Sequence, residues 1–277
     1  ERRRTDDGTT KLLLRFPDGA SVETVHIPSR RRDRAATLCV STQVGCPVGC
    51  PFCASGLAGL QRNLSTGEIL EQFVRGRHLG PLSRAVIMGI GEPLLNWKNL
   101  APALRVVNDE MGLGARRVTL STVGFPERLA KIAPEKPPFQ LAISLHSPFD
   151  AERAELVPAM KDVPVEDVLQ AGDHWFETTG REVTYEYVLL GGLNDTPRHA
   201  LALVEKLRRR RCTLNLIPWN PLGDERWQRP TPAQVEAFQA ELQAGGLVAT
   251  VRWSRGVEAD AACGQLRIRH EPGSVLE

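Results

Sequence analysis

The sequence lacks several features that would place it in common classes of protein. It has no run of about 18 apolar residues, so no membrane span is expected. Its N-terminal stretch, ERRRTDDGTTKLLLRF, lacks the apolar core of a signal peptide. Aromatic residues make up only 5%, and a net charge of +2 does not make a polycation. We therefore expect a cytoplasmic monomer with no membrane partner, in which any nucleic-acid binding comes from local patches.

What the sequence does contain is enough apolar material for a substantial core. The chain has 277 residues, of which 42% are hydrophobic, enough for one large α/β domain. The segment KLLLRFPDGASVETVHIP predicts a β-hairpin, because Pro17, Asp18 and Gly19 form a turn signal between two strand-like runs. The arginine-rich segment SRRRDR follows as a loop. We therefore expect a hairpin with a basic loop over residues 1–35 and a larger unit over residues 36–277.

The larger unit alternates between strand-like and helix-like patterns. Helices are expected over residues 65–79, 95–111, 126–132, 150–160, 165–179, 194–208 and 231–243. Strands are expected at ATLCVSTQ, RAVIMGI, RRVTLSTVG, PFQLAISLH, REVTYEYVLL, CTLNLIPWN and LVATVRW. This alternation favours a parallel sheet, and about six such units suit a partial barrel better than a short open sheet. Polar and glycine-rich residues follow these strands, and such residues gather at the carboxyl edge of a parallel sheet, which predicts one site there.

Four of the six cysteines lie in CVSTQVGCPVGCPFC. Cys46, Cys50 and Cys53 have the spacing C-x3-C-x2-C, and Cys39 lies seven residues upstream. Disulfides are rare in the cytosol, and structural zinc sites usually combine two distant cysteine pairs. Three thiolates suit a [4Fe–4S] cluster with one open iron. Cys39 as a fourth ligand of a structural metal site remains the alternative.

The wider pattern of motifs resembles a known family. C-x3-C-x2-C with Phe52 before its last cysteine is the signature of radical S-adenosylmethionine (SAM) enzymes. Five further blocks accompany the extended cysteine segment, and together they resemble the RlmN/Cfr family of radical SAM RNA methyltransferases over nearly the whole chain. These blocks are MGIGEPLLNWKNL, RRVTLSTVG, LAISLHSP, LNLIPWNP and DAACGQL. The resemblance implies a radical SAM partial (β/α)6 barrel with an N-terminal β-hairpin extension.

The resemblance also implies a mechanism with two cysteines. Cys263 matches the cysteine that is methylated by one SAM, and Cys46, Cys50 and Cys53 match the ligands of the [4Fe–4S] cluster that binds a second SAM. The adenosyl radical from that SAM takes a hydrogen from the methyl group on Cys263, and the resulting radical adds to an adenine ring. Cys39 matches the cysteine that resolves the adduct by forming a disulfide with Cys263. Both cysteines would therefore be catalytic.

The remaining site residues follow from the same resemblance. Glu23 matches the proposed proton acceptor, although a solvent-facing strand glutamate is the commoner reading. The matches to the SAM contacts are Gly91, Glu92, Ser121, Ser144, Leu145, His146 and Asn220. Cys212 lies in the apolar run CTLNLIP and is expected in the core.

The expected partner is RNA, with 23S rRNA, and also tRNA, as the substrate and methylation at C2 of adenosine. The alternatives are methylation at C8, another substrate, or, in a different class, a zinc-stabilised RNA-binding module. We expect the family's N-terminal helical RNA-binding domain to be absent. The SRRRDR loop and the run Arg208 to Arg211 could contact phosphates or be solvated. An electron donor such as flavodoxin or ferredoxin is implied.

Overall fold

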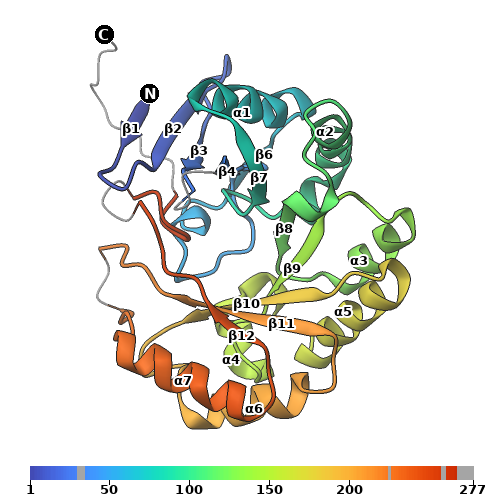
Figure 1. Ribbon diagram of the computed structural model, residues 1–277, viewed down its shortest axis with the longest axis vertical. Coiled ribbons are helices and arrows are strands. Elements are labelled where there is room, and N and C mark those ends of the chain that lie inside the picture. The colour runs from blue at the N-terminus through green and yellow to red at the C-terminus, as the bar shows by residue number, and fades with distance from the viewer. Residues whose placement is uncertain (30–34, 224–225, 257–259, 267–277) are drawn as a thin grey trace.

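A computed structural model describes residues 1–29, 35–223, 226–256 and 260–266 (Figure 1). Its main feature is a ten-stranded sheet with the order β1-β2-β3-β4-β7-β8-β9-β10-β11-β12. The strands of this sheet are β1 (Arg2–Arg4), β2 (Thr10–Arg15), β3 (Ser21–Ile27), β4 (Ala36–Cys39), β7 (Leu82–Ile87), β8 (Val118–Thr122), β9 (Gln140–Ser144), β10 (Val183–Leu189), β11 (Cys212–Pro218) and β12 (Ala249–Val251). The α-helices are α1 (Thr66–Leu79), α2 (Trp97–Asp109), α3 (Pro126–Ile132), α4 (Asp150–Leu156), α5 (Val165–Thr179), α6 (Pro197–Leu207) and α7 (Pro232–Ala244).

The predicted N-terminal hairpin is confirmed. β2 and β3 pair antiparallel, with Leu13 opposite Glu23, and the Asp18 side chain accepts a hydrogen bond from the Ala20 amide at 3.1 Å in the turn. The edge strand β1 was not predicted, because three consecutive arginines carry no alternating apolar pattern. The basic loop predicted at residues 30–34 lies outside the described residues.

The parallel part of the sheet forms the expected partial barrel. In the main sheet, β4, β7, β8, β9, β10, β11 and β12 each pair in parallel with the next strand of this order. β3 pairs antiparallel with β4 on the edge opposite β7, so both edges of β4 are occupied. In the described residues β12 pairs only with β11. The barrel therefore remains open, and the hairpin extends its first edge.

Most helix predictions hold, with shifts at the ends. Ser65 caps α1, accepting from the Glu68 amide at 3.2 Å, while the Glu68 carboxylate accepts from the Ser65 amide at 2.8 Å, so the predicted capping box is confirmed. The helix predicted from residue 194 begins only at Pro197. The reason is that Thr196 has an extended backbone and Pro197 takes the first helical position, which suits its fixed φ and its missing N–H. The Asn194 side chain instead accepts from the Leu190 amide and donates to two backbone carbonyls.

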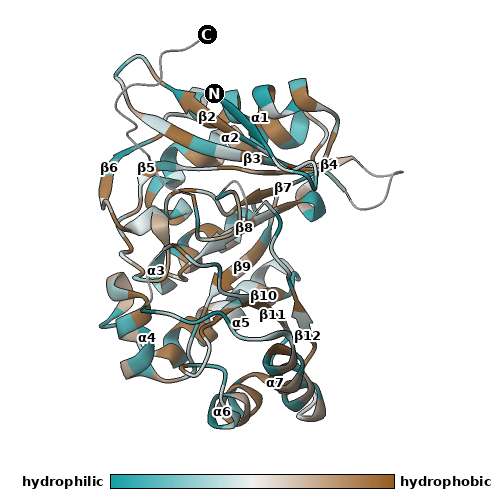
Figure 2. Ribbon diagram, turned by 90° about the vertical axis from the view of Figure 1, so that its left-hand side faces the viewer, coloured by the Kyte–Doolittle hydropathy of each residue, from teal (hydrophilic) through white to brown (hydrophobic). Residues whose placement is uncertain are grey.

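The core lies between the sheet and the helices that cover its outer side. Figure 2 shows hydrophobic strands β7 and β9 in the middle of the molecule. Trp175 of α5 stacks on Phe139 with ring centroids 5.4 Å apart, and both side chains are fully buried. A second, two-stranded sheet of β5 (Gln43–Gly45) and β6 (Leu60–Asn63) was not predicted, and it frames the cysteine segment. No described helix has the length and apolar character needed to cross a membrane.

Candidate active site

The loop between β5 and β6 carries Cys46, Cys50 and Cys53. Gly45 ends β5 with φ of +78°, and a Cβ atom there would lie 1.9 Å from the carbonyl oxygen of Gly59. Only glycine fits such a position. The Cys46 amide donates to the same oxygen at 3.0 Å. The loop is thus closed at its base, and its three thiols line one cavity.

These thiols form a donor set that suits an iron–sulfur cluster. Burial raises the pKa of all three thiols, that of Cys46 to about 12. Binding of a metal would displace their protons, and thiolates are the usual ligands of iron–sulfur clusters. In the part of the chain that the structure describes, no three His, Cys, Asp or Glu side chains are grouped to hold a single metal ion. The donor chemistry fits a [4Fe–4S] cluster, whose ligands bind different irons, with one iron free of protein.

The expected SAM contacts converge on the same cavity, with one exception. The strand-end residues that line it beside the thiols include Gly91, Glu92, Ser121, Ser144, His146 and Asn220. Leu145 is not among the lining residues, because its side chain points into the core and is 1% exposed. The prediction that these strand ends meet at one edge is therefore confirmed for the geometry, while their contacts with SAM stay a prediction.

Glu92 is buried at the wall of this cavity. Its carboxylate accepts hydrogen bonds from the Thr122 hydroxyl at 2.6 Å, the Val123 amide at 2.9 Å and the Leu94 amide at 3.0 Å. Burial raises the pKa of Glu92 to about 7, although these hydrogen bonds act in the opposite direction. Gly91 has φ of +110°, and a Cβ there would lie 2.7 Å from that of Gln43. The segment is therefore fixed in a backbone conformation that requires glycine.

His146 lies in the left-handed region with φ of +63°, which places its ring inside the site. Its Nδ1 accepts a hydrogen bond from the Val188 amide at 3.1 Å, so the ring proton is on Nε2. Burial, together with the charge of Arg153, lowers the pKa of His146 to about 3. The ring meets Phe52 edge-on at 5.0 Å between centroids. His146 is therefore a neutral imidazole with one available donor.

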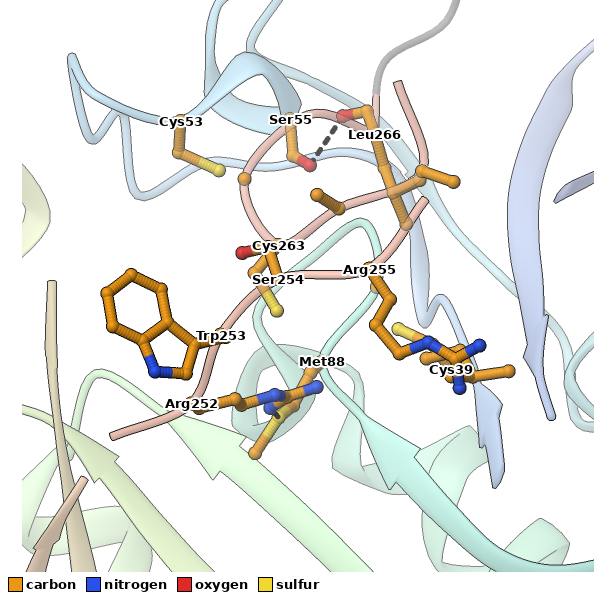
Figure 3. Close-up of a pocket in the computed structure, with 15 residues that line it drawn as sticks. Cys39, Cys53, Ser55, Met88, Arg252, Trp253, Ser254, Arg255, Cys263 and Leu266 are labelled. Carbon is orange, nitrogen blue, oxygen red and sulfur yellow. Dashed lines mark hydrogen bonds between the residues drawn. The ribbon is translucent and has the colours of Figure 1, made fainter. Parts of the chain in front are cut away.

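Cys39 and Cys263 line a second cavity, although 224 positions separate them in sequence (Figure 3). Cys39 ends β4, and Cys263 lies in the C-terminal segment, which passes beside the N-terminal hairpin in Figure 1. Cys263 also lines the cavity of the three thiols, so it stands where the two cavities meet. Burial raises the pKa of Cys39 to about 12, and both cysteines are free thiols.

Comparison with known proteins agrees with this geometry. The radical SAM superfamily profile matches residues 40–204. A relative from Parasynechococcus marenigrum, named probable dual-specificity RNA methyltransferase RlmN, is 46% identical over 273 residues, which cover 96% of this chain and 78% of the relative. A crystal structure of a radical SAM methyltransferase from Sphaerobacter thermophilus is 44% identical, with a TM-score of 0.91 over 96% of this chain and 80% of that chain. SuiB of Streptococcus suis bound to SAM, at 13% identity, shares the fold (TM-score 0.59 over 80% of this chain and 51% of that chain).

The chain belongs to the RlmN family of radical SAM proteins. It is therefore a radical SAM enzyme, and the resemblance of its six sequence blocks is confirmed. Because the chain belongs to this family, the alternative of a non-catalytic, zinc-stabilised RNA-binding module is rejected.

In this RlmN-family chain, Asn220 follows β11 and is committed to other protein groups. Its Nδ2 donates to the Cys263 carbonyl at 2.9 Å and to the Ser254 hydroxyl at 2.7 Å, and its Oδ1 accepts from Arg229 at 2.6 Å. Asn220 therefore holds the segment that carries Cys263, besides lining the cavity of the three thiols.

Glu23 is buried. The alternative expectation, that it is a solvent-facing glutamate of a strand, was therefore wrong. Its carboxylate forms an ion pair with Lys11 at 2.7 Å, and both side chains are at most 10% exposed. Lys11 also donates to the Asp260 carbonyl at 3.3 Å. The ion pair therefore lies between the hairpin and the segment that carries Cys263. Whether Glu23 accepts a proton stays a prediction.

Sequence reasoning missed Arg252, which follows β12. Its guanidinium lies between Cys263 and Met88 in Figure 3 and donates to the Met88 sulfur at 3.1 Å. The negative charge that Cys263 can carry raises the pKa of Arg252. The position of Arg252 at the carboxyl end of a strand could have indicated a site residue. However, the sequence VRW is also typical of the end of an amphipathic strand, so it did not mark Arg252 as functional.

The run from Arg208 to Arg211 is partly committed within the protein. Arg210 forms ion pairs with Glu166 at 2.6 Å and with Asp173. Its three arginine neighbours are exposed. Only these neighbours retain the predicted capacity to contact phosphates, which stays a prediction. Cys212 is partly buried against the core, as expected.

Proposed function

We propose that this chain methylates C2 of an adenosine in RNA, in 23S rRNA and also in tRNA, through a methyl group carried by Cys263. The placement of Cys263 carries the proposal, because its side chain borders both the cavity of the three thiols and the cavity that holds Cys39. The family's two-cysteine chemistry requires such a position. Flavodoxin or ferredoxin would supply the electron, and the enzyme would act as a monomer.

Cys46, Cys50 and Cys53 would hold the [4Fe–4S] cluster. With SAM bound, the cluster supplies a carbon radical that can remove a hydrogen atom from a methyl group. Gly91 and Glu92 would hold the SAM amino group, since a carboxylate and an ammonium form a charge-assisted pair. Ser121, Ser144 and His146 border the rest of the cavity with two hydroxyls and one N–H donor. The backbone around the buried Leu145 would complete this wall.

Cys263 first carries the methyl group and then the covalent link to the adenine carbon. A covalent intermediate of this kind divides one difficult step into easier ones. Glu23 would accept the proton lost from the adenine carbon, and Lys11 holds its carboxylate at 2.7 Å. Cys39, as the thiolate, would attack the Cys263 sulfur, so that the S–S bond forms, the bond from sulfur to the methylene carbon breaks, and that carbon takes up a proton to become the methyl group of the product. A thiol reductant would then restore both side chains.

The decisive experiment identifies the methyl carrier and the product. Protein purified without oxygen should be brown, contain about four irons and four sulfides per chain, and show one methyl group on Cys263 by peptide mass. Nucleoside mass analysis of RNA after turnover should show 2-methyladenosine. A colourless protein with stoichiometric zinc that resists reconstitution would refute the proposal. An 8-methyladenosine product would instead assign the C8 activity.

A further inference from the structure

Arg153 is a charged residue buried behind the wall of the thiol cavity. It lies on α4 and is 1% exposed. Nε donates to the Leu145 carbonyl at 3.1 Å, and Nη2 donates to the carbonyls of Val123 at 2.7 Å and Ser144 at 3.1 Å. The side chain therefore ties together the segments that follow β8 and β9. All of these acceptors are uncharged.

In the part of the chain that the structure describes, no counter-ion lies within contact distance of the Arg153 guanidinium. Among the described residues, Arg153 takes part in no ion pair, and its Nη1 is buried without a hydrogen-bond partner. The acid that acts on it electrostatically is Asp150, whose Oδ1 accepts from the Val165 amide at 2.7 Å. A buried cation without an anion is costly, so this site suits an anion that the described residues do not provide.

An anion that could compensate the charge of Arg153 would form at Cys50. Among the groups that act electrostatically on Arg153, Cys50 has the largest effect, ahead of Asp150. Val123 and Ser144, whose carbonyls hold the guanidinium, line the same cavity as Cys50. A cluster bound by three thiolates is an anion, and its reduced form carries one more negative charge than its oxidised form.

We propose that Arg153 is the fixed counter-cation of the iron–sulfur site and raises the reduction potential of the cluster. The inference rests on the proposed function, because it needs a cluster on Cys46, Cys50 and Cys53. A positive charge in a low-dielectric environment stabilises the reduced, more negative cluster more than the oxidised one. Arg153 does not contact the substrate. It acts as a positioning residue, because its charge acts on the cluster and its N–H groups hold three backbone carbonyls.

The test compares variants that separate the charge from the hydrogen bonds. Arg153→Gln and Arg153→Met remove the charge, and Arg153→Lys retains it. Arg181→Gln is the matched control, because Arg181 also donates to backbone carbonyls, those of Pro137 and Phe139, at the opposite ends of the strands. Each protein is reconstituted, assayed for iron and titrated with dithionite, which supplies the single electron, while EPR reports the reduced cluster.

At a fixed potential, the ratio of reduced to oxidised cluster should be at least tenfold lower in the uncharged variants than in wild type. For a one-electron couple this corresponds to a reduction potential that is lower by about 59 mV. Arg153→Lys and Arg181→Gln should remain close to wild type. Unchanged potentials in a loaded uncharged variant, or equal shifts for lysine and glutamine, would overturn the inference. If neither uncharged variant holds a cluster, loading of the lysine variant supports the counter-cation, and its failure overturns it. A wild-type protein without a cluster would refute the proposed function instead.

Discussion

Asn220 Nδ2 donates a hydrogen bond to the backbone carbonyl of Cys263 at 2.9 Å, across 43 positions of the chain. Asn220 follows β11, the next-to-last strand of the main sheet, whereas Cys263 lies on a C-terminal segment without regular secondary structure. The barrel thus holds Cys263 through a buried side chain, and the Ala54 amide adds a hydrogen bond to the neighbouring Gly264 carbonyl at 2.7 Å. Several of the predictions below concern contacts of this kind.

Replacing Asn220 with alanine should loosen the Cys263 segment. The partly buried Cys263 carbonyl and the Ser254 hydroxyl would lose their donor, at a cost of about 1 kcal/mol. We expect slower formation of the Cys39–Cys263 disulfide under a mild oxidant, measured by mass spectrometry. Asn108→Ala, which removes only an exposed hydrogen bond to Asp109, is the control. Equal rates in both variants would show that Asn220 does not position Cys263.

Trp219→Phe should weaken the hold on the cluster loop. The Trp219 indole donates to the Phe52 carbonyl at 2.9 Å, next to Cys53, and a phenylalanine cannot do so. The expected loss is about 1 kcal/mol, seen as faster release of iron to a chelator. Trp175→Phe is a matched control, because the buried Trp175 indole nitrogen has no partner to lose among the described residues. Iron release that is equally fast in both variants would contradict the prediction.

The ion pair between Lys11 and Glu23 should show strong coupling. Lys11→Met would leave the Glu23 carboxylate buried without its lysine, and we expect a loss of about 3 kcal/mol in the free energy of unfolding. Adding Glu23→Gln should recover much of this loss, as measured by denaturant unfolding in a double-mutant cycle. Additive effects of the two changes would contradict the prediction.

Glu23→Gln alone also tests the proposed proton acceptor. The glutamine is close in shape to the glutamate but cannot take up a proton, so methylated RNA should not be released. Methylation of Cys263, read by peptide mass, should persist. Normal turnover of Glu23→Gln would remove the proposed role in proton transfer and would leave Glu23 only its structural role as the partner of Lys11.

Asp7 and Arg255 should give the Cys263 segment an acid-sensitive anchor. Nε of Arg255 donates to Asp7 Oδ2 at 3.0 Å. Burial would raise the pKa of Asp7, but hydrogen bonds from Thr5, Thr9 and Arg255 outweigh it and hold the pKa well below its usual value. A lowered pKa stabilises the folded state above the ordinary aspartate value of about 4 and loses this contribution as the pH falls further.

The matching variant is Asp7→Asn. Near neutral pH it should be less stable than wild type by about 1 kcal/mol or less, because the pair is partly exposed. This difference should shrink as the pH falls below about 4, when measured by denaturant unfolding across pH. A difference that does not vary with pH would mean that the carboxylate charge plays no part in the anchor.

Cys39→Ala should trap the enzyme on its RNA. Cys263 could still form the covalent adduct, but the thiol proposed to release the product would be gone, and Cys53, which lines the same cavity, would be bound to the cluster. A denaturing gel should show a stable protein–RNA species, which Cys263→Ala should not form. Free Cys39→Ala protein with normal turnover would remove the resolving role.

Local patterns predicted much of the fold. The turn signal in the hairpin, the capping box at Ser65 and the strand–helix alternation act over a few residues, and each was confirmed. The errors lie where longer-range contacts compete with local preference. Asn194 satisfies distant carbonyls instead of starting α6, and β5 and β6 pair only because the cysteine loop closes on Gly59.

The sequence by itself determined the family, the three-cysteine motif and the identity of the two further cysteines, because these are fixed by residue type and spacing. Only the tertiary structure decided that Cys39 and Cys263 share a cavity, that Lys11 pairs with Glu23 and that Arg153 is buried with no ion-pair partner among the described residues. Burial and charge compensation depend on which segments meet in space. The packing of the hairpin, α4 and the C-terminal segment around one sheet edge sets those contacts, and no local pattern records them.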